Sequence, residues 1–297
     1  MKIVIAGGTG FIGEALAREL LRVGEVVVLS RDPAKVREGR GVAWSAAPGG
    51  AWEGEIAEAD AVVNLAGENI GAGRWTPERK KRLLDSRVNA TGALAEAISA
   101  RPRDGRVFVS ASAIGIYGDR GDEVLDESAP PGTGVLSEIS RRWEAASRAA
   151  SGARLVNPRL GIVLGRDGGA LPKMALPVRF FAGGKVGSGR QWMSWVDLRD
   201  VIRLVVWAIE TKTAEGAYNV VAPNPVTNAE FVATLGTVLH RPTAIPTPAA
   251  ALRLALGEAA DELLLASQRV VPRRAEQQGF RFEVRDLAAS LRSIYGV

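Results

Sequence analysis

Ser112 and Tyr117 are the side chains whose types and spacing best suit proton transfer in this chain. Both lie in the segment SASAIGIYG (110–118), which directly follows the strand-like run 106–109. A serine hydroxyl can hydrogen-bond a substrate carbonyl, and a phenol can act as acid or base toward a substrate oxygen. The pattern places no lysine near Tyr117, so we expect its phenol to keep a pKa of about 10. Packing beneath a substrate loop is the alternative role for Tyr117.

A glycine turn near the start of the chain, GGTGFIG (7–13), has the spacing expected of an anion site. The apolar run 3–6 predicts a buried strand, and the amphipathic pattern of 11–23 predicts a helix after the turn. The first N–H groups and the dipole of such a helix point at whatever lies over the turn. Tight packing alone is the alternative explanation for the glycines. The predicted contacts to a dinucleotide are Gly7, Thr9, Gly10, Phe11 and Ile12.

The residues after the second predicted strand, 26–29, indicate which dinucleotide is bound. An acidic residue directly after this strand would accept the ribose 2′-hydroxyl of NAD, but this chain has Ser30 and Arg31 there. Both suit a 2′-phosphate, so the sequence predicts NADP. Asp32 leaves NAD open, and Arg31 as an ordinary solvated loop arginine is the alternative.

A third buried run, 61–66, leads into a glycine and an acidic residue. The carboxyl ends of parallel strands line the ligand crevice of a doubly wound sheet, so small residues here would let the dinucleotide approach the backbone. This argument adds Leu65, Ala66, Gly67 and Glu68 to the predicted cofactor contacts. The predicted set is completed by Arg87, Ser110 and Leu160.

The composition narrows the possible partners. The chain has 297 residues, a net charge of +5, no cysteine and one histidine, His240. Disulfides and thiolate chemistry are therefore excluded, no metal site is expected, and a cytoplasmic location fits. Basic and acidic residues are interspersed, and we interpret the densest basic cluster, 79–82, as a solvated helix face, so nucleic acid is not expected. The most apolar stretches carry charges or fall short of the ~20 residues that a membrane span needs.

The order of the predicted elements favours an α/β fold. Strands and helices alternate through about residue 165, which predicts a Rossmann doubly wound parallel sheet over 1–165, joined by later segments near 190–222. Residues 166–297 are then mainly a smaller C-terminal α/β substrate part with a helical extension. Helices are predicted at 76–85, 87–100, 136–150, 196–210 and 227–239. The segment 165–190 reads as glycine-rich loops with basic side chains that would suit an anionic small-molecule substrate; an ordinary connection is the alternative.

Together, these motifs resemble a known family. The chain is similar to the atypical extended short-chain dehydrogenases of the YfcH-like epimerase group over nearly its whole length. The resemblance rests on the glycine turn, NLAGENI (64–70), RWTPERKKRLLDSRVNAT (74–91), SASAIGIYG (110–118), GGKVGSGRQWMSWVDLRD (183–200) and VVPRRAEQQGF (270–280). It implies a Rossmann domain, NADP and a C-terminal extension. Many extended relatives form dimers, so the resemblance leaves a homodimer open without fixing the oligomeric state. It does not imply a particular substrate.

The chain departs from that family at the catalytic pair. Short-chain dehydrogenases commonly place Tyr and Lys on one helix face with YxxxK spacing, but this sequence has no YxxxK, and Leu136 and Ser140 stand in their places. Asp197 stands where the group has a histidine. Two hypotheses therefore remain: an NADP-dependent oxidoreductase or epimerase that transfers hydride at the nicotinamide, and a non-catalytic NADP(H)-binding sensor or scaffold.

Overall fold

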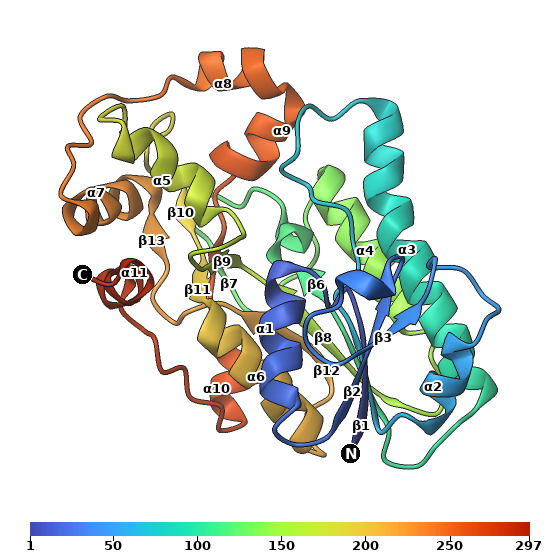
Figure 1. Ribbon diagram of the computed structural model, residues 1–297. Helices are drawn as coiled ribbons and strands as arrows, with labels where there is room; N and C mark the ends of the chain where they lie inside the picture. The colour runs from blue at the N-terminus through green and yellow to red at the C-terminus, as the bar shows by residue number, and fades with distance from the viewer.

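The computed structural model describes all 297 residues around one parallel sheet (Figure 1). The eight strands follow the order β12-β8-β5-β4-β1-β2-β3, with β6 paired to β8, and every pair is parallel. The order reverses between β1 and β4, which opens the ligand crevice at the carboxyl ends of these strands. The predicted Rossmann fold is thereby confirmed. The strands are β1 (Lys2–Ala6), β2 (Glu25–Ser30), β3 (Arg40–Ala43), β4 (Ala61–Asn64), β5 (Val107–Ser110), β6 (Ser112–Ala113), β8 (Arg154–Leu160) and β12 (Gly216–Val220).

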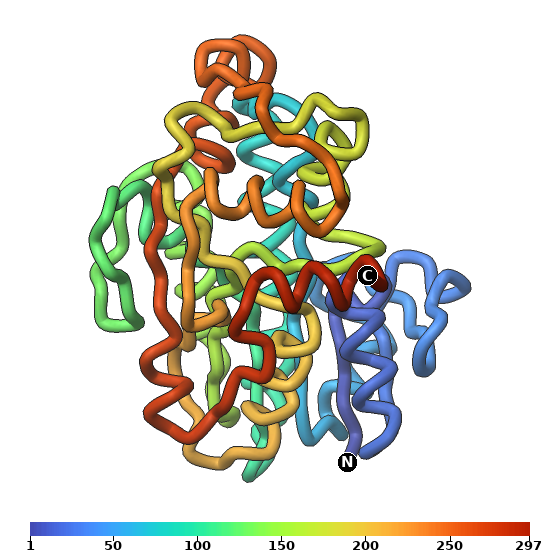
Figure 2. The backbone as a smooth tube through the Cα atoms, turned by 90° about the vertical axis from the view of Figure 1, so that its left-hand side faces the viewer, coloured from blue at the N-terminus to red at the C-terminus, as the bar shows by residue number.

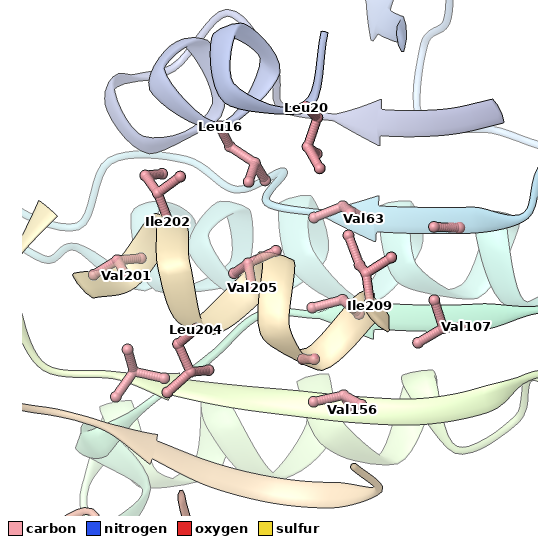
Figure 3. Close-up of a cluster of buried hydrophobic side chains, with 14 of the residues drawn as sticks. Leu16, Leu20, Val63, Val107, Val156, Val201, Ile202, Leu204, Val205 and Ile209 are labelled. Atoms are coloured by element: carbon pink, nitrogen blue, oxygen red, sulfur yellow. The ribbon is translucent and has the colours of Figure 1, made fainter. Parts of the chain in front are cut away.

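Helices cover both faces of the sheet. On one face, α1 (Phe11–Leu20) and α6 (Leu198–Glu210) pack against each other and bury the largest apolar cluster; Figure 3 shows their side chains, such as Leu16 and Val205, meeting those of the strands. On the other face, α2 (Trp52–Glu58) and α3 (Pro77–Ala100) cover the sheet, and α4 (Val135–Ser147) packs against α3. Strand residues such as Ile3, Val4 and Ile5 are fully buried because they lie between these layers.

Helix α3 differs from the two predicted helices. It runs unbroken for 24 residues, and its Thr76 cap accepts a hydrogen bond from the N–H of Arg79. The expected break near residue 86 is absent: Ser86 lies within the helix, where its hydroxyl donates to the carbonyl of Leu83 and accepts from the N–H of Glu68. Arg79, at the start of the expected solvated face, is mostly buried, with a side chain only 12% exposed.

The segment 165–190 contains a helix where only loops were expected. Helix α5 (Leu171–Arg179) begins with a proline in its first turn, where the missing N–H is tolerated. Pro177 lies inside this helix, and its presence among many glycines hid the helical pattern. Around it lie short pairs of strands: β9 (Ile162–Leu164) with β11 (Trp195–Asp197), and β10 (Trp192–Met193) with β13 (Val226–Thr227).

The C-terminal extension wraps back onto the rest of the chain. Figure 2 shows it descending along one side of the molecule and turning back before the terminal helix. Its strand β14 (Arg269–Val270) pairs with β7 (Val124–Leu125), α10 (Arg273–Gln277) packs on β12, and α11 (Leu287–Tyr295) packs on α7 (Asn228–Leu239). No helix in the structure combines the length and apolar character needed to cross a bilayer. The remaining elements are the helices α8 (Ala249–Leu256) and α9 (Glu258–Ala260), the short 3₁₀ helices η1 (Pro33–Lys35) and η2 (Ile114–Tyr117), and the one-turn π-helix η3 (Asp261–Leu265).

Candidate cofactor site and active site

The three glycines of the turn after β1 have different tasks. Gly7 has φ +82°, and a Cβ there would lie 2.7 Å from the carbonyl carbon of Leu65; a Cβ at Gly13 would lie 2.2 Å from the Gly7 oxygen. Both are therefore required by the fold itself. A Cβ at Gly10 would meet only the Gly7 oxygen, at 3.3 Å. Gly10 also precedes α1 without any side-chain cap, so the first N–H groups of the helix are left for an anion.

The turn after β2 presents a cation without an acidic partner. Arg31 forms no ion pair, whereas the neighbouring Asp32 carboxylate lies 3.1 Å from the Lys35 ammonium. Arg31 lines a pocket of about 270 Å³ with two tryptophans, Trp44 just after β3 and Trp52 at the start of α2. Ala43, Ser45, Gly49 and Gly50 complete the wall. No sequence pattern pointed to these six residues, because most of them lie in the loop between β3 and α2, which is rich in alanine and glycine.

The end of β4 lies directly beside the glycine turn. A Cβ at Gly67 would lie 3.2 Å from the guanidinium carbon of Arg87. That guanidinium donates to the carbonyls of Leu83 and Glu68, at 2.9 and 3.0 Å, and lies over the Trp143 ring. Burial, only partly offset by the Glu68 charge, lowers the pKa of Arg87 to about 10. Arg87 is thus a buried cation held by carbonyl oxygens next to the predicted cofactor backbone contact.

The other predicted cofactor contacts lie around the same edge of the sheet. The Phe11 ring packs closely against the glycines of 165–169. A Cβ added at Gly165 would lie only 2.4 Å from the ring. Leu160 ends β8 beside Ala113 of β6. The Ser110 hydroxyl instead faces into the protein, where it accepts a 3.4 Å hydrogen bond from the amide of Asn64. Thr9 is exposed in the turn, and Ile12 and Ala66 are partly exposed beside it.

Ser112 belongs to a buried charged network. Its hydroxyl donates to Oε1 of Glu144 on α4 at 2.8 Å. The same carboxylate accepts two hydrogen bonds from the Arg159 guanidinium of β8, at 2.8 and 3.1 Å. With its proton committed to Glu144, the Ser112 oxygen offers lone pairs, not a proton, to a neighbouring group. The sequence pattern did not reveal Glu144 and Arg159, since they are brought together from separate elements.

Tyr117 belongs to the same network. Its hydroxyl donates to Oδ1 of Asn219 at 2.8 Å and accepts from the Arg159 guanidinium at 2.9 Å. The side chain is fully buried, and this burial raises the pKa of Tyr117 against the opposing influence of Arg159. Arg159 therefore links both predicted catalytic residues, but it does so within the protein interior.

The positions of the usual tyrosine and lysine lie on α4. Leu136 packs against η2, near Gly115, and Ser140 is buried. The N–H groups of Val135 and Leu136 donate to the carboxylate of Glu262, at 2.6 and 2.7 Å. Glu262 comes from the C-terminal extension, and nothing in the sequence pattern pointed to it. The extension thus places a carboxylate where the helix with the usual catalytic pair begins.

A parallel sheet whose strand order reverses beside an open glycine turn defines the Rossmann class of dinucleotide-binding folds. Residues 3–221 match the NAD dependent epimerase/dehydratase family, and residues 247–294 match a domain of unknown function, DUF1731. The chain belongs to this epimerase/dehydratase family. The resemblance drawn from the motifs is therefore confirmed.

Several relatives match over almost the whole chain. The epimerase family protein YfhF of Bacillus subtilis is 39% identical over 98% of this chain and 97% of its own. A chloroplastic SDR39U1 homologue of Arabidopsis thaliana is also 39% identical, over 99% of this chain and 86% of its own, so a cytoplasmic location stays a prediction. A crystal structure of human epimerase family protein SDR39U1 with NADPH is 36% identical, with a TM-score of 0.89 over 100% of this chain and 99% of that one.

Proposed function

We propose that this protein is an NADP(H)-dependent oxidoreductase or sugar-nucleotide-type epimerase that transfers hydride at the nicotinamide. The observation that carries the proposal is the pairing of an open Gly10 with an unpaired Arg31, at the ends of adjacent strands. The first suits a pyrophosphate and the second a 2′-phosphate. The NADPH in the related human structure supports the choice of cofactor.

Residues of the chain bind the cofactor and orient the substrate. The first turn of α1 binds the pyrophosphate, and Gly67 lets the backbone approach the dinucleotide beside Arg87. When bound, the nicotinamide supplies or accepts the hydride. The Ser112 oxygen, whose proton is held by Glu144, orients a substrate hydroxyl as a hydrogen-bond acceptor. Catalysis then rests on positioning, without a phenol activated by lysine.

The test is a calorimetric titration of the protein with NADPH and with NADH. Arg31→Ala should weaken NADPH binding by about tenfold to a hundredfold, because it removes charge-assisted hydrogen bonds, and should change NADH binding little. Arg22→Ala is the control, since Arg22 is an exposed arginine just after α1 that is paired only with Glu19. Equal losses for both cofactors would refute the 2′-phosphate assignment. A protein that binds neither cofactor would refute the proposed function.

A second candidate function is that of a non-catalytic NADP(H)-binding sensor or scaffold. It is favoured by Leu136 and Ser140 on α4 and by the buried, fully engaged hydroxyl of Tyr117. Stereospecific transfer of deuterium from labelled NADPH to a product, across a panel of carbonyl compounds and sugar nucleotides, would support the enzyme. Tight NADPH binding with no transfer to any member of the panel would support the sensor.

A further inference from the structure

One short segment at the carboxyl end of β4, residues 67–71, is contacted by four cationic side chains. The Arg79 guanidinium lies 3.3 Å from Oε1 of Glu68, and the Arg82 guanidinium lies 3.7 Å from Oε2. Arg87 donates to the Glu68 carbonyl at 3.0 Å. Lys173, from α5, donates to the Gly71 carbonyl at 3.0 Å. Cations from both halves of the chain therefore meet at this segment.

The cluster has more positive than negative charge. Glu68 is the one carboxylate that pairs with any of these four cations, and it pairs with only two of them, Arg79 and Arg82. Other acidic groups near α3 are already engaged, since Asp85 pairs with Lys81 and Glu258 pairs with Lys80. Arg82 and Lys173 are exposed, whereas Arg79 and Arg87 are mostly buried. A buried cation without full compensation is unfavourable, so the two buried guanidiniums favour a further anion here.

Arg79 shows the imbalance most clearly. Its side chain is only 12% exposed. One terminal nitrogen faces Glu68 and the other donates to the Asn69 carbonyl at 2.7 Å, but the buried Nε has no acceptor. Buried N–H groups are normally satisfied, so this guanidinium has donor capacity left for a further oxygen atom.

The location of the cluster separates it from the cofactor phosphates. Segment 67–71 begins two residues after Leu65. Leu65 lies against the glycine turn, since a Cβ at Gly7 would lie 2.7 Å from its carbonyl carbon. In the proposed function, the α1 turn and Arg31 already account for the pyrophosphate and the 2′-phosphate. Arg87 is also a predicted cofactor contact. Arg79, Arg82 and Lys173 are therefore left for the second ligand, which must also reach the crevice.

We propose that Arg79, Arg82 and Lys173 receive an oxyanion group of the substrate, a carboxylate or a phosphate. Glu68 is the internal carboxylate that holds the two arginines until the substrate displaces it. This inference rests on the proposed function, since it assigns the substrate class of the same site. The sequence suggested that the basic side chains of 165–190 bind the anionic group. Of these, Lys173 is the one placed at this cluster by a hydrogen bond, so the inference gives the main role to α3 arginines instead.

The experiment titrates malonate and inorganic phosphate, in separate arms, into protein saturated with NADPH. We expect weak binding, and the tighter of the two probes indicates whether the group is a carboxylate or a phosphate. Arg79→Gln should weaken binding by about tenfold and the more exposed Arg82→Gln by about threefold. Glu68→Gln should strengthen binding by about threefold or more, because it removes the competing carboxylate.

Arg142→Gln is the matched control. Arg142 is as exposed as Arg82, at 60%, and is likewise paired with a glutamate, Glu138, but it lies on α4. Binding of neither probe, an unchanged affinity in Arg82→Gln, or weaker binding in Glu68→Gln would each overturn the inference. If NADPH itself does not bind, the proposed function fails, and the same anion titrations on the free protein still test the cluster separately.

Discussion

The carboxylate of Glu262 accepts a 2.7 Å hydrogen bond from the backbone N–H of Leu136 and so joins the C-terminal extension to the first turn of α4. The residue before this helix, Gly134, has no side chain that could cap it. A carboxylate at a helix N-terminus satisfies free N–H groups and interacts favourably with the helix dipole. The extension therefore completes an element of the Rossmann half instead of merely following it.

Loss of this contact should lower the stability of the protein. Glu262→Ala should lower the free energy of unfolding by about 1–2 kcal/mol, since it leaves two N–H groups without their charged acceptor. The measurement is urea unfolding followed by circular dichroism. Asp261→Ala is the control, because Asp261 forms only an exposed pair with Arg253 and should cost less than about 0.5 kcal/mol. Equal losses in the two variants would contradict the capping role.

Substitutions at Gly10 and Gly13 should separate cofactor binding from folding. Gly10→Val should keep the fold, because a Cβ there meets one atom at 3.3 Å, but should abolish NADPH binding by filling the space over the turn. Gly13→Ala should destabilise the protein by several kcal/mol, since its Cβ would lie 2.2 Å from the Gly7 oxygen. Thermal unfolding and NADPH titration of both variants check this. A Gly10→Val protein with normal NADPH affinity would remove Gly10 from the site.

Much of the cofactor half could be predicted from the sequence, because its signals are local. The buried strand 3–6, the glycine turn and the helix after it are consecutive in the chain, so residue types and spacing describe the whole unit. The Thr227 cap of α7 is equally local: its side chain and that of Glu230 exchange hydrogen bonds with each other's backbone N–H.

The charged contacts could not be predicted in this way, because each joins distant parts of the chain. Glu144 and Arg159 are 15 positions apart, and Glu262 is 126 positions from Leu136. Arg79 belongs to a run of basic residues that is typical of a solvated face, yet it is buried because the loop after β4 folds back over it. The spacing of apolar residues predicts which face of a helix is buried. It does not predict which charged or polar groups a distant loop will place against the other face.

The network that joins Ser112 and Arg159 through Glu144 should stabilise the protein, and substitutions in it should lower the free energy of unfolding. Glu144→Gln leaves the Arg159 cation buried without its carboxylate, so we expect a loss of about 3–5 kcal/mol in the free energy of unfolding. Ser112→Ala removes one hydrogen bond to a charged group and should cost about 1.5–3 kcal/mol. A double-mutant cycle should give a coupling energy of at least about 0.5 kcal/mol between the two sites. Strict additivity would show that the hydroxyl and the carboxylate act independently.

The acid stability of the protein should depend on Glu55, which lies on α2. Hydrogen bonds from Arg40, at 2.9 and 2.8 Å, and then the Lys2 ammonium lower the pKa of Glu55 from 4.5 to about 2. The unfolded chain therefore binds more protons at this group between pH 4.5 and 2, so the contribution is complete above pH 4.5 and is lost as the pH falls toward 2. Glu55→Gln should lower the free energy of unfolding by about 1–2 kcal/mol at pH 7, allowing for solvent screening of the half-exposed Arg40, and by much less at pH 2.5.

Urea unfolding at pH 7, 4.5 and 2.5 tests the prediction for Glu55. Glu96→Gln, at an exposed α3 position, is the control. If the difference between Glu55→Gln and the parent protein is the same at all three pH values, Glu55 does not carry this acid dependence.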